Sequence, residues 1–387
     1  MAIKILSVDD ELDLEILLTQ YFRRKIKKGE YEFYFAHNGL EALQMMLAMP
    51  DFDVILSDIN MPEMDGLTLL TKINEMRNPA LKCIMVSAYG DMENIRSAMN
   101  QGAFDFTTKP INLEDLERTI EKAAEQIAFI KQAQKEHTQL ESIQNDLHVA
   151  QEIQQTILPK TFPPFPELKS FDLYAYMSAA KYVGGDFYDF FLIDDNKLCF
   201  VVADVSGKGI PAALFMMSAR AIIKNLVLIT SDVLEIVKEL NTQLNQGNET
   251  YMFVSAFISI IDLQTGIMTF VSAGHNPPLI KKRGNEKFEY MKVKNNCILG
   301  IEENVNFEKQ EIKLEKEDVI FVYTDGVTEA RNEEKLYGTS KLEETLNKEY
   351  DGDIYNIVPK IRKSIDEFSE GKSQYDDITM LVFKYNK

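Results

Sequence analysis

Short apolar runs alternate with helix-length segments over the first 120 residues. The runs are KILSV (4–8), YEFYFA (31–36), DVILS (53–57), KCIMVS (82–87) and FDFTT (104–108). Strands that read as continuous apolar runs are typical of a parallel sheet covered by helices on both faces. The pattern therefore predicts a doubly wound α/β domain with a five-stranded parallel sheet over residues 1–120.

A long polar helix is predicted next, because the stretch from Leu113 to Leu158 contains no Gly or Pro. Apolar or small residues recur at spacings of three and four over 113–130, and again over 140–157 with a displacement of one residue. This spacing is typical of a coiled coil, and a displaced phase locally alters its winding. A parallel homodimer through a linker at 121–158 is favoured over one amphipathic helix packed on its own domain, because so long a helix exceeds what a globular domain needs.

The remainder of the chain is rich in strands. Four prolines within 159–166 end the helix and predict an extended, stiff strap over 159–169. Strands are expected at 171–177, 197–205, 253–262, 267–274 and 318–326, and helices at 211–229 and 233–246, with LQTG (263–266) as a hairpin turn. Strands that pair with their neighbours and are covered by helices predict a layered α+β domain over 170–387.

Composition narrows the functional class. The chain has a net charge of −19, 45% apolar residues and 27% charged residues. So acidic a protein is not expected to bind nucleic acid, and a transcription factor would also need a helix-turn-helix after its first domain. We expect a cytoplasmic protein without a membrane span, because it has neither an apolar run of about 18 residues nor a signal-like start. The three cysteines lack zinc-ligand spacing and are expected to be reduced thiols.

Polar side chains follow four of the predicted parallel strands. Asp9 and Asp10 follow the first, Asp58 the third, Ser87 the fourth and Lys109 the last. Because ligands of such sheets lie beyond the carboxyl ends of the strands, these side chains are expected to meet. Oxygen-only ligands select Mg²⁺, which would hold a phosphoryl group against Asp58 while Lys109 pairs with it and Ser87 donates to it.

Acids recur at strand ends in the second domain. Asp186 follows a glycine pair, Asp204 and Asp325 end apolar strands, and Asp376 and Asp377 open another. A carboxylate at such a position is costly unless another charge offsets it, so metal ions are expected. Without His or Cys the ligands are oxygens, which favours Mg²⁺ or Mn²⁺. Two such ions activate water and hold phosphate oxygens, which is the chemistry of phosphate-ester hydrolysis.

Some motifs of the second domain also allow other interpretations. VGGDFYDF (183–190) resembles a nucleotide-cyclase hairpin, but Phe187 stands where that enzyme needs Glu, and a plain strand corner is also conceivable. SGKG (206–209) is no Walker A loop, because Gly209 rather than Ser or Thr follows the lysine. His275 in AGHNPP is more commonly a loop residue than an acid–base group.

The first domain resembles the receiver domain of bacterial two-component response regulators. The motifs that carry the resemblance are DD at 9–10, DVILSDINMPEMDGL at 53–67, VSAYGD at 86–91 and FTTKP at 106–110. The resemblance implies that Asp58 is the phosphoacceptor and that Asp9 and Asp10 form an acidic pair near Mg²⁺, with the Asn60 carbonyl as a further ligand. It also implies that Ser87 and Phe106 are the switch hydroxyl and the switch aromatic residue, and that Lys109 pairs with the phosphate.

The second domain is similar to the stage II sporulation protein E branch of the metal-dependent, type 2C protein phosphatases. The motifs are AQEIQQTILP (150–159), VGGDFYDF, ADVSGKGIPAAL (203–214), SAGHNPP (272–278), YTDGVTEA (323–330) and YDDITMLVF (375–383). The resemblance implies a sandwich of two antiparallel sheets, flanked by helices, with two Mn²⁺ or Mg²⁺ ions between the sheets. The implied metal ligands are Asp186, a shared Asp204, the Val205 carbonyl, Asp325 and Asp376.

Other positions in this domain have less defined expected roles. Asp377 lies next to the ligands, Asp189 is expected to be structural or to support a ligand, and Lys181 to help bind substrate phosphate. Ser206 stands where animal-type relatives carry a His, which leaves the general acid unassigned.

Together the resemblances imply a response regulator whose output is a protein-serine/threonine phosphatase. Its expected partners are a sensor histidine kinase or phosphotransfer protein and, as substrate, a phosphorylated anti-sigma-factor antagonist in a partner-switching pathway. The alternative is an adaptor with a phosphatase fold that binds its partner without hydrolysis. All four aspartate positions are filled, which favours the enzyme.

Overall fold

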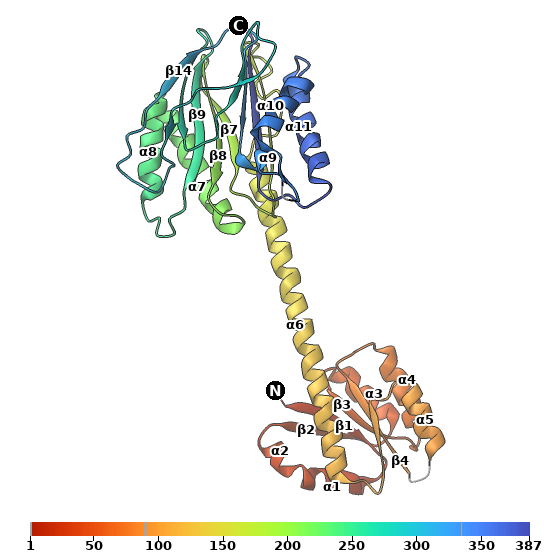
Figure 1. Ribbon diagram of the computed structural model, residues 1–387. Coiled ribbons are helices and arrows are strands. Elements are labelled where there is room, and N and C mark those ends of the chain that lie inside the picture. Colours follow the sequence, from red (N-terminus) through yellow and green to blue (C-terminus); the bar gives the residue numbers. More distant parts are fainter. Residues whose placement is uncertain (1, 89–90, 334) are drawn as a thin grey trace. The chain divides into compact units, whose positions relative to one another are not determined.

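The protein is described by a computed structural model that covers residues 2–88, 91–333 and 335–387 (Figure 1). The chain forms two compact units, residues 1–143 and 144–387. One long helix, α6 (Leu113–Ile157), contributes residues to both units.

The first unit is a parallel sheet between two helical layers. Its strand order is β2-β1-β3-β4-β5, and every neighbouring pair is parallel. The strands are β1 (Ile3–Val8), β2 (Tyr31–Ala36), β3 (Val54–Asp58), β4 (Lys82–Ala88) and β5 (Asp105–Lys109), and the shorter helices are α1 (Leu12–Tyr21), α2 (Arg23–Lys27), α3 (Gly39–Ala48), α4 (Gly66–Glu75) and α5 (Met92–Asn100). The predicted doubly wound sheet is confirmed.

Helix α6 begins as part of the first unit. Leu116, Ile120, Ala123 and Ile127 are buried in the core beneath the sheet. Lys25 of α2 also forms ion pairs with Glu117 and Glu121, at 2.7 and 2.6 Å. The apolar phase over 113–130, which spacing alone assigned to a coiled coil, therefore packs on its own unit.

The second apolar phase of α6 is exposed at its beginning. Leu140 and Ile143 have exposed fractions of 58% and 55%, whereas Leu147, Ala150 and Ile157 of the same phase are half-buried. Leu140 and Ile143 therefore leave a short uncovered apolar face on the helix.

The second unit is a two-sheet sandwich, as predicted. One sheet has the order β13-β10-β9-β8-β7, with β14 also on β10, and the other has the order β12-β11-β15-β18-β6. Pairing is antiparallel except between β10 and β13. The first sheet comprises β7 (Phe187–Asp194), β8 (Lys197–Val205), β9 (Val254–Asp262), β10 (Ile267–Ala273), β13 (Asn295–Asn296) and β14 (Gln310–Lys313); the second comprises β6 (Phe171–Ser178), β11 (Leu279–Lys281), β12 (Glu289–Tyr290), β15 (Val319–Tyr323) and β18 (Ile378–Tyr385).

Helices cover the outer faces of this sandwich (Figure 1). Helices α7 (Ile210–Ile229) and α8 (Val233–Asn245) contact the first sheet, while α11 (Ile354–Ser369) contacts the second and packs against α10 (Gly338–Glu349). A short helix, α9 (Asp325–Thr328), and a small hairpin of β16 (Arg331–Asn332) and β17 (Lys335–Leu336) follow β15. Between the sheets, the rings of Phe200 and Phe383 stack with centroids 5.5 Å apart.

The proline-rich strap is packed on the second unit. Phe162, Phe165 and Leu168 lie against its main core, and the Tyr188 hydroxyl donates to the Pro159 carbonyl at 2.6 Å. The strap therefore holds the end of α6 close to β7.

Helix α7 is long and apolar enough, by length and composition, to cross a membrane. Its stripe of buried residues, which includes Ala212, Met216, Ala219 and Ile223, belongs instead to the main core of the sandwich. The apolar character of α7 is explained by its packing on β7 and β8.

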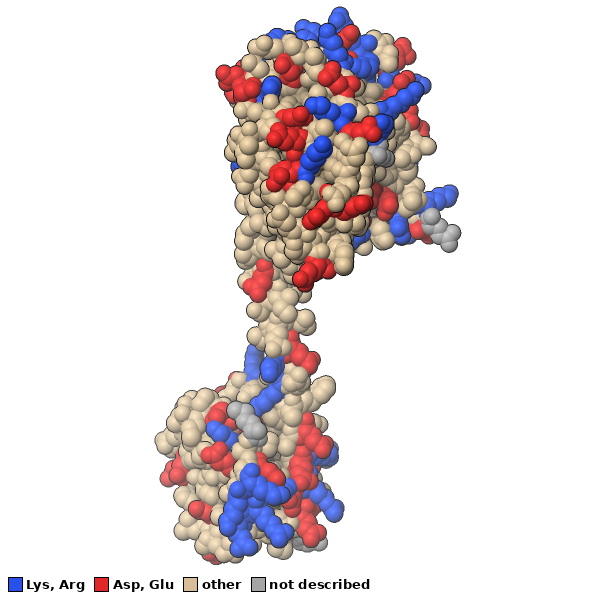
Figure 2. Space-filling model, turned by 90° about the vertical axis from the view of Figure 1, so that its left-hand side faces the viewer, with Lys and Arg blue, Asp and Glu red and all other residues tan. Residues whose placement is uncertain are grey.

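Charge is unevenly distributed over the surface. Figure 2 shows acidic and basic side chains intermixed on one face, with Lys and Arg gathered on the part of the first unit that carries α2. The sequence of α2 is RRKIK. The net charge of −19 therefore conceals local basic surfaces.

Candidate functional site

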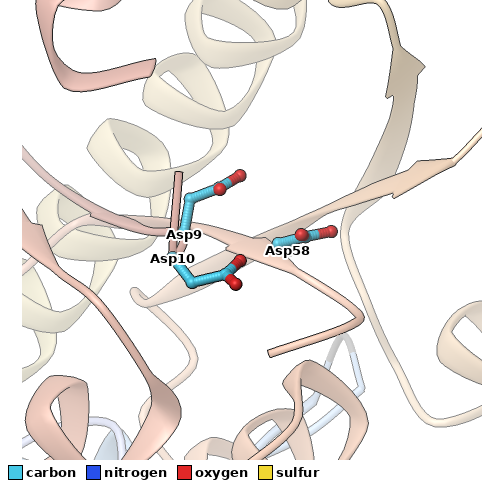
Figure 3. Close-up of side chains that lie close together, drawn as sticks. All are labelled: Asp9, Asp10 and Asp58. Carbon is cyan, nitrogen blue, oxygen red and sulfur yellow. The ribbon is translucent and has the colours of Figure 1, made fainter. Parts of the chain in front are cut away.

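The carboxyl edge of the first sheet gathers three aspartates. Asp9 and Asp10 directly follow β1, and Asp58 ends the neighbouring strand β3. One carboxylate oxygen from each lies within 4.8 Å of the others, and Figure 3 shows the three side chains close together at this edge. Asp9 and Asp58 are buried and Asp10 is exposed. Such a cluster of oxygens fits a hard cation such as Mg²⁺.

Lys109 lies at the same edge. Its Nζ is 3.0 Å from Asp9 Oδ2, 3.0 Å from Asp58 Oδ2 and 3.1 Å from Glu11 Oε1. Burial lowers the pKa of Lys109, but hydrogen bonds to these carboxylates raise it more, so the lysine stays charged. The pKa of Asp58 is raised because burial outweighs the opposing effect of Lys109.

The structure distributes the remaining predicted receiver residues around this edge. Ser87 is fully buried, and its hydroxyl donates to the Ala88 carbonyl at 3.5 Å. Phe106 on β5 is 37% exposed. Asn60 is exposed and follows Ile59, whose backbone N–H donates to Asp58 Oδ1 at 2.8 Å.

Four aspartates of the second unit come from both sheets of the sandwich. Asp186 precedes β7 and Asp204 lies near the end of β8, and these strands pair with Phe187 opposite Ala203. Asp325 begins α9, after β15 has ended at Tyr323, and Asp376 precedes β18, the partner of β15. Asp325 was predicted as a strand end and is instead the first residue of a short helix.

The four carboxyls influence one another electrostatically. Burial and then Asp204 and Asp377 raise the pKa of Asp186 well above its ordinary value. Burial, with Asp325 as the main repelling charge, raises the pKa of Asp204 to about 7, and burial, with Glu329 as the main repelling charge, raises the pKa of Asp325 to about 6. Asp204 therefore interacts with the acids of both sheets.

This arrangement fits cations. Asp186 is buried and the other three aspartates are half-buried. Carboxylates in such positions that repel one another are stabilised by a bound metal ion, and an all-oxygen set favours Mg²⁺ or Mn²⁺. Among the residues that the structure describes, only the receiver trio places three acids within 4.8 Å of one another. The four aspartates of the second unit do not meet this spacing.

Asp377 has a different position from the four predicted ligands. Its Oδ1 accepts from the Ala180 N–H and its Oδ2 from the Gly185 N–H, both at 2.7 Å. A Cβ on Gly184 would lie 2.2 Å from Asp377 Oδ2, so the glycine is required for this close approach. Asp377 thus fixes the loop that presents Asp186.

The Val205 carbonyl lies against the same loop. A Cβ on Gly185 would be 2.7 Å from this oxygen. The second glycine of VGGD therefore lets the carbonyl predicted as a ligand approach the backbone beside Asp186.

Gln154 at the end of α6 was not predicted from the sequence. It is buried, its Nε2 donates to the Gly184 carbonyl at 2.6 Å, and its Oε1 accepts from the Gly184 N–H at 3.0 Å. The end of the linker helix is therefore hydrogen-bonded to the loop that carries Asp186. A signal existed, because a polar residue stands at 154, where the apolar spacing of 140–157 requires an apolar one.

Two further residues that sequence reasoning did not assign contact the acids. The Thr324 hydroxyl donates to Asp186 Oδ2 at 2.6 Å. Lys208, from the rejected phosphate-loop motif, has its Nζ 2.8 Å from Asp376 Oδ2 and donates to the Tyr375 carbonyl at 2.7 Å. Thr324 orients one acid, and Lys208 partly neutralises another.

Three residues whose roles the sequence left open, Asp189, Ser206 and Lys181, lie in structural or exposed positions. Asp189 forms a buried ion pair with Arg220 of α7 at 2.6 Å. Ser206 accepts a hydrogen bond from the Phe253 N–H at 2.9 Å, and Lys181 is exposed near Gly209.

His275 is buried, with its Nδ1 3.0 Å from the Ser255 hydroxyl. Burial lowers the pKa of His275 to about 4, so the imidazole is neutral at pH 7. It therefore carries no proton that it could readily give up as a general acid at this pH.

Comparison with known proteins gives the family of each unit. The sequence pattern of the response regulator receiver domain matches residues 5–121, and that of stage II sporulation protein E matches residues 194–386. The second match begins after Asp186, so it leaves that residue outside its range.

Two relatives match more than half of the chain. Phosphoserine phosphatase RsbU of Bacillus subtilis (strain 168) is 27% identical over 275 residues, which are 70% of this chain and 80% of RsbU. Protein IcfG of Synechocystis sp. is 28% identical over 269 residues, 62% of this chain but 42% of IcfG. The chain thus spans less than half the length of IcfG.

A solved structure shares the fold. The SiaA-PP2C domain of Pseudomonas aeruginosa aligns with a TM-score of 0.55 and 20% identity, over 64% of this chain and 98% of that domain. This likeness supports a PP2C-type fold.

Proposed function

Because this chain joins a response regulator receiver domain to a phosphatase domain of the stage II sporulation protein E family, we propose that it is a metal-dependent protein-serine/threonine phosphatase controlled by phosphorylation of Asp58. The observation that carries the proposal is the set of four mutually repelling aspartates drawn from both sheets. The relative RsbU, a phosphoserine phosphatase by name, supports the same reaction class.

The metal ligands would be Asp186, Asp204, Asp325, Asp376 and the Val205 carbonyl. Two bound Mn²⁺ or Mg²⁺ ions supply a water of lowered pKa and hold phosphate oxygens. The protein's own contribution is positional. Thr324 fixes the orientation of Asp186, and the Gly184–Gly185 backbone is held by Asp377 on one side and Gln154 on the other.

Lys208 is placed to interact with the phosphate group of a substrate. Its ammonium already lies beside Asp376, at the edge of the acid cluster. A lysine there offsets negative charge on both the carboxylate and an incoming phosphate. Lys208 is therefore a better candidate than the exposed Lys181 for this role.

In the receiver, Mg²⁺ would bind at Asp9, Asp10, Asp58 and the Asn60 carbonyl. A phosphoryl group on Asp58 places anionic oxygens beside the Lys109 ammonium, which now pairs with the bare carboxylate. The Ser87 hydroxyl would break its long 3.5 Å hydrogen bond to the Ala88 carbonyl and donate to a phosphoryl oxygen instead. The Phe106 ring would then turn toward the interior of the receiver. These changes bias one receiver conformation over another.

The linker is the proposed route of control. The same helix, α6, contributes Leu116 and Ile120 to the receiver core. Near its end, Gln154 binds Gly184 in the loop that presents Asp186, the metal loop. A coupling of about 1–3 kcal/mol between the two sites would be typical. We infer a homodimer through the exposed apolar face at Leu140 and Ile143.

The proposed partners follow from the two families. A sensor histidine kinase or phosphotransfer protein would phosphorylate Asp58. The substrate would be a phosphorylated anti-sigma-factor antagonist, so the protein would act in partner-switching control of a sigma factor in the cytoplasm.

The direct test is Mn²⁺-dependent release of phosphate from phosphoserine proteins by the full chain. Asp325→Ala, which removes one proposed ligand, serves as the blank. Release by the wild type that the blank lacks supports the enzyme. Binding of a phosphoprotein without release, across several substrates and metal concentrations, would instead establish the adaptor.

A further inference from the structure

A cavity of about 210 Å³ lies beside the acid cluster of the second unit. Gly326 and Tyr375 line it, and they are the immediate neighbours of Asp325 and Asp376. The cavity is smaller than the roughly 300–1,000 Å³ of sites for whole small molecules, and therefore suits a single side chain.

Most of the charged residues that line this cavity are basic. Arg331, Arg362 and Lys372 contribute positive charge, whereas Asp366 contributes a carboxylate that pairs with Arg362 at 3.0 Å. In a protein with a net charge of −19, such a lining next to an acidic metal site is a local reversal of sign. It attracts an anion that the surrounding surface repels.

The cavity wall is connected to Asp376, one of the four aspartates, through contacts with Tyr375 and Lys208. The guanidinium of Arg331 lies 3.7 Å from the centroid of the Tyr375 ring, and the Lys208 ammonium lies 4.2 Å from the same centroid. Stacking on an aromatic ring holds the planar guanidinium in place and leaves its N–H groups free to bind a carboxylate. Lys208 in turn pairs with Asp376.

Gln374 makes a second connection between the cavity and the acids. It accepts from Arg362 Nη1 at 2.8 Å and donates to the Asp376 carbonyl at 2.7 Å. It also donates to the Ser178 carbonyl at the end of β6, at 2.7 Å. The cationic wall and the Asp376 loop are thus held in a fixed relation.

We propose that this cavity binds an acidic side chain of the phosphoprotein substrate, close in sequence to its phosphoserine. The inference rests on the proposed phosphatase function and deepens it, because it names a feature that the substrate must carry. Arg331 and Lys372 are the specificity-determining residues, and the ligand is an aspartate or glutamate carboxylate bound by a guanidinium fork.

The test compares two fluorescently labelled peptides that differ in charge beside the target serine. One carries two Glu residues there and the other two Gln residues. Both carry unmodified serine, so they are products and are not consumed. Fluorescence anisotropy with the full-length protein in Mn²⁺ gives the Kd of each peptide for the wild type, Arg331→Glu and Lys372→Glu.

Lys363→Glu is the matched control. Lys363 lies on α11 next to Arg362, is exposed, and does not line the cavity. It undergoes the same change of charge, and therefore reports any effect of net charge alone.

The wild type is expected to bind the Glu peptide about tenfold more tightly than the Gln peptide. Arg331→Glu and Lys372→Glu are expected to remove that preference, and Lys363→Glu to retain it. Equal binding of both peptides by the wild type, or equal loss of preference in the control, would overturn the inference. Phosphate release from the phosphoserine forms is read separately, so a failure of hydrolysis is distinguishable from a failure of this cavity.

Discussion

At the scale of single residues, the proposed metal site of the second unit combines the buried carboxyl of Asp186 with half-buried carboxyls that repel one another. Asp204 is central, because Asp325 and Asp376 repel it from the second sheet and its own charge raises the pKa of Asp186 in the first. Without a metal ion these charges oppose the folded state. Removing one of these carboxylate charges should therefore stabilise the folded state when no metal is bound. When metal is bound, the same change should destabilise the folded state.

Asp204→Asn is expected to stabilise the metal-free protein at pH 7.5. Burial and the neighbouring acids raise the pKa of Asp204 to about 7, so the folded protein binds a proton that the unfolded chain releases above about pH 4. The stability of the wild type therefore falls as the pH rises from about 4 to 7, and Asn removes this loss, on the order of 1–3 kcal/mol. Thermal unfolding of the second unit in EDTA, at pH 5 and pH 7.5, measures the difference.

Asp195→Asn, at an exposed position, is the control and should have little effect. Mn²⁺ should reverse the order by stabilising the wild type more than Asp204→Asn. Equal stabilisation of both proteins by Mn²⁺ would show that Asp204 is not a ligand.

Metal binding should weaken as the pH falls. Asp204 and Asp325, with pKa values raised to about 7 and about 6, must lose their protons to bind a cation. The Mn²⁺ concentration for half-maximal binding should rise on the order of tenfold per pH unit just below pH 7, and more steeply below pH 6. Isothermal titration at constant ionic strength tests this; a flat dependence between pH 5.5 and 7.5 would be the contrary result.

Sequence reasoning found residues whose type alone suggests chemistry and missed those that act through geometry. Aspartates after apolar runs were visible because a charge there is costly. Thr324 and Gln154 were missed, because a threonine and a helical glutamine are ordinary until folding brings them to Asp186 and Gly184. Lys208 was set aside because its motif was judged only as a Walker A loop.

At the scale of elements, α6 changes partners along its length. Its first turns are buried in the receiver core, its middle is exposed, and Gln154 near its end is buried against the metal loop. A displacement or rotation of the helix end would act on the backbone two residues before Asp186.

Gln154→Ala is expected to lower Mn²⁺ affinity and phosphatase activity by roughly tenfold. The change removes both hydrogen bonds to Gly184, and leaving buried polar groups unpaired costs about 1–3 kcal/mol. Gln155→Ala removes an exposed neighbour and serves as the control. Mn²⁺ titration of phosphate release compares the variants, and equal activity of both with the wild type would show that the grip on Gly184 has no functional effect.

The exposed middle of α6 should mediate dimerisation. Leu140→Glu combined with Ile143→Glu places charges on the uncovered apolar face and should convert a dimer into monomers. Asn145→Glu, on another exposed face, should leave the dimer intact. Sedimentation velocity distinguishes the two outcomes; a monomeric wild type, or dissociation by both changes, contradicts a coiled-coil dimer.

Regular elements were predictable because apolar spacing determines them. The predicted strands at 31–36 and 197–205 agree with β2 and β8, and the LQTG turn joins β9 and β10, with Asp262 accepting from the Gln264 and Thr265 N–H groups. Helix α11 was not predicted, and the packing of the first part of α6 was assigned to another helix. Spacing identifies an apolar face, but it does not identify what covers that face.

At the scale of the whole molecule, we propose that phosphorylation of Asp58 controls phosphatase activity of the second unit. The proposed route comprises the Lys109–Asp58 pair, the receiver core around α6 and the Gln154–Gly184 contact. Each part is present in the chain, and control requires that the two states of the receiver differ in how α6 holds the metal loop.

The most direct measurement is the rate of phosphate release from a phosphoserine protein in Mn²⁺, with and without beryllofluoride as a mimic of phosphorylated Asp58. The wild type should change its rate about 5- to 150-fold, the range of typical coupling energies. Asp58→Ala should release phosphate at one rate under both conditions. Control through Asp58 would be contradicted if the wild type released phosphate at the same rate with and without beryllofluoride. It would also be contradicted if beryllofluoride changed the rate of Asp58→Ala as much as that of the wild type.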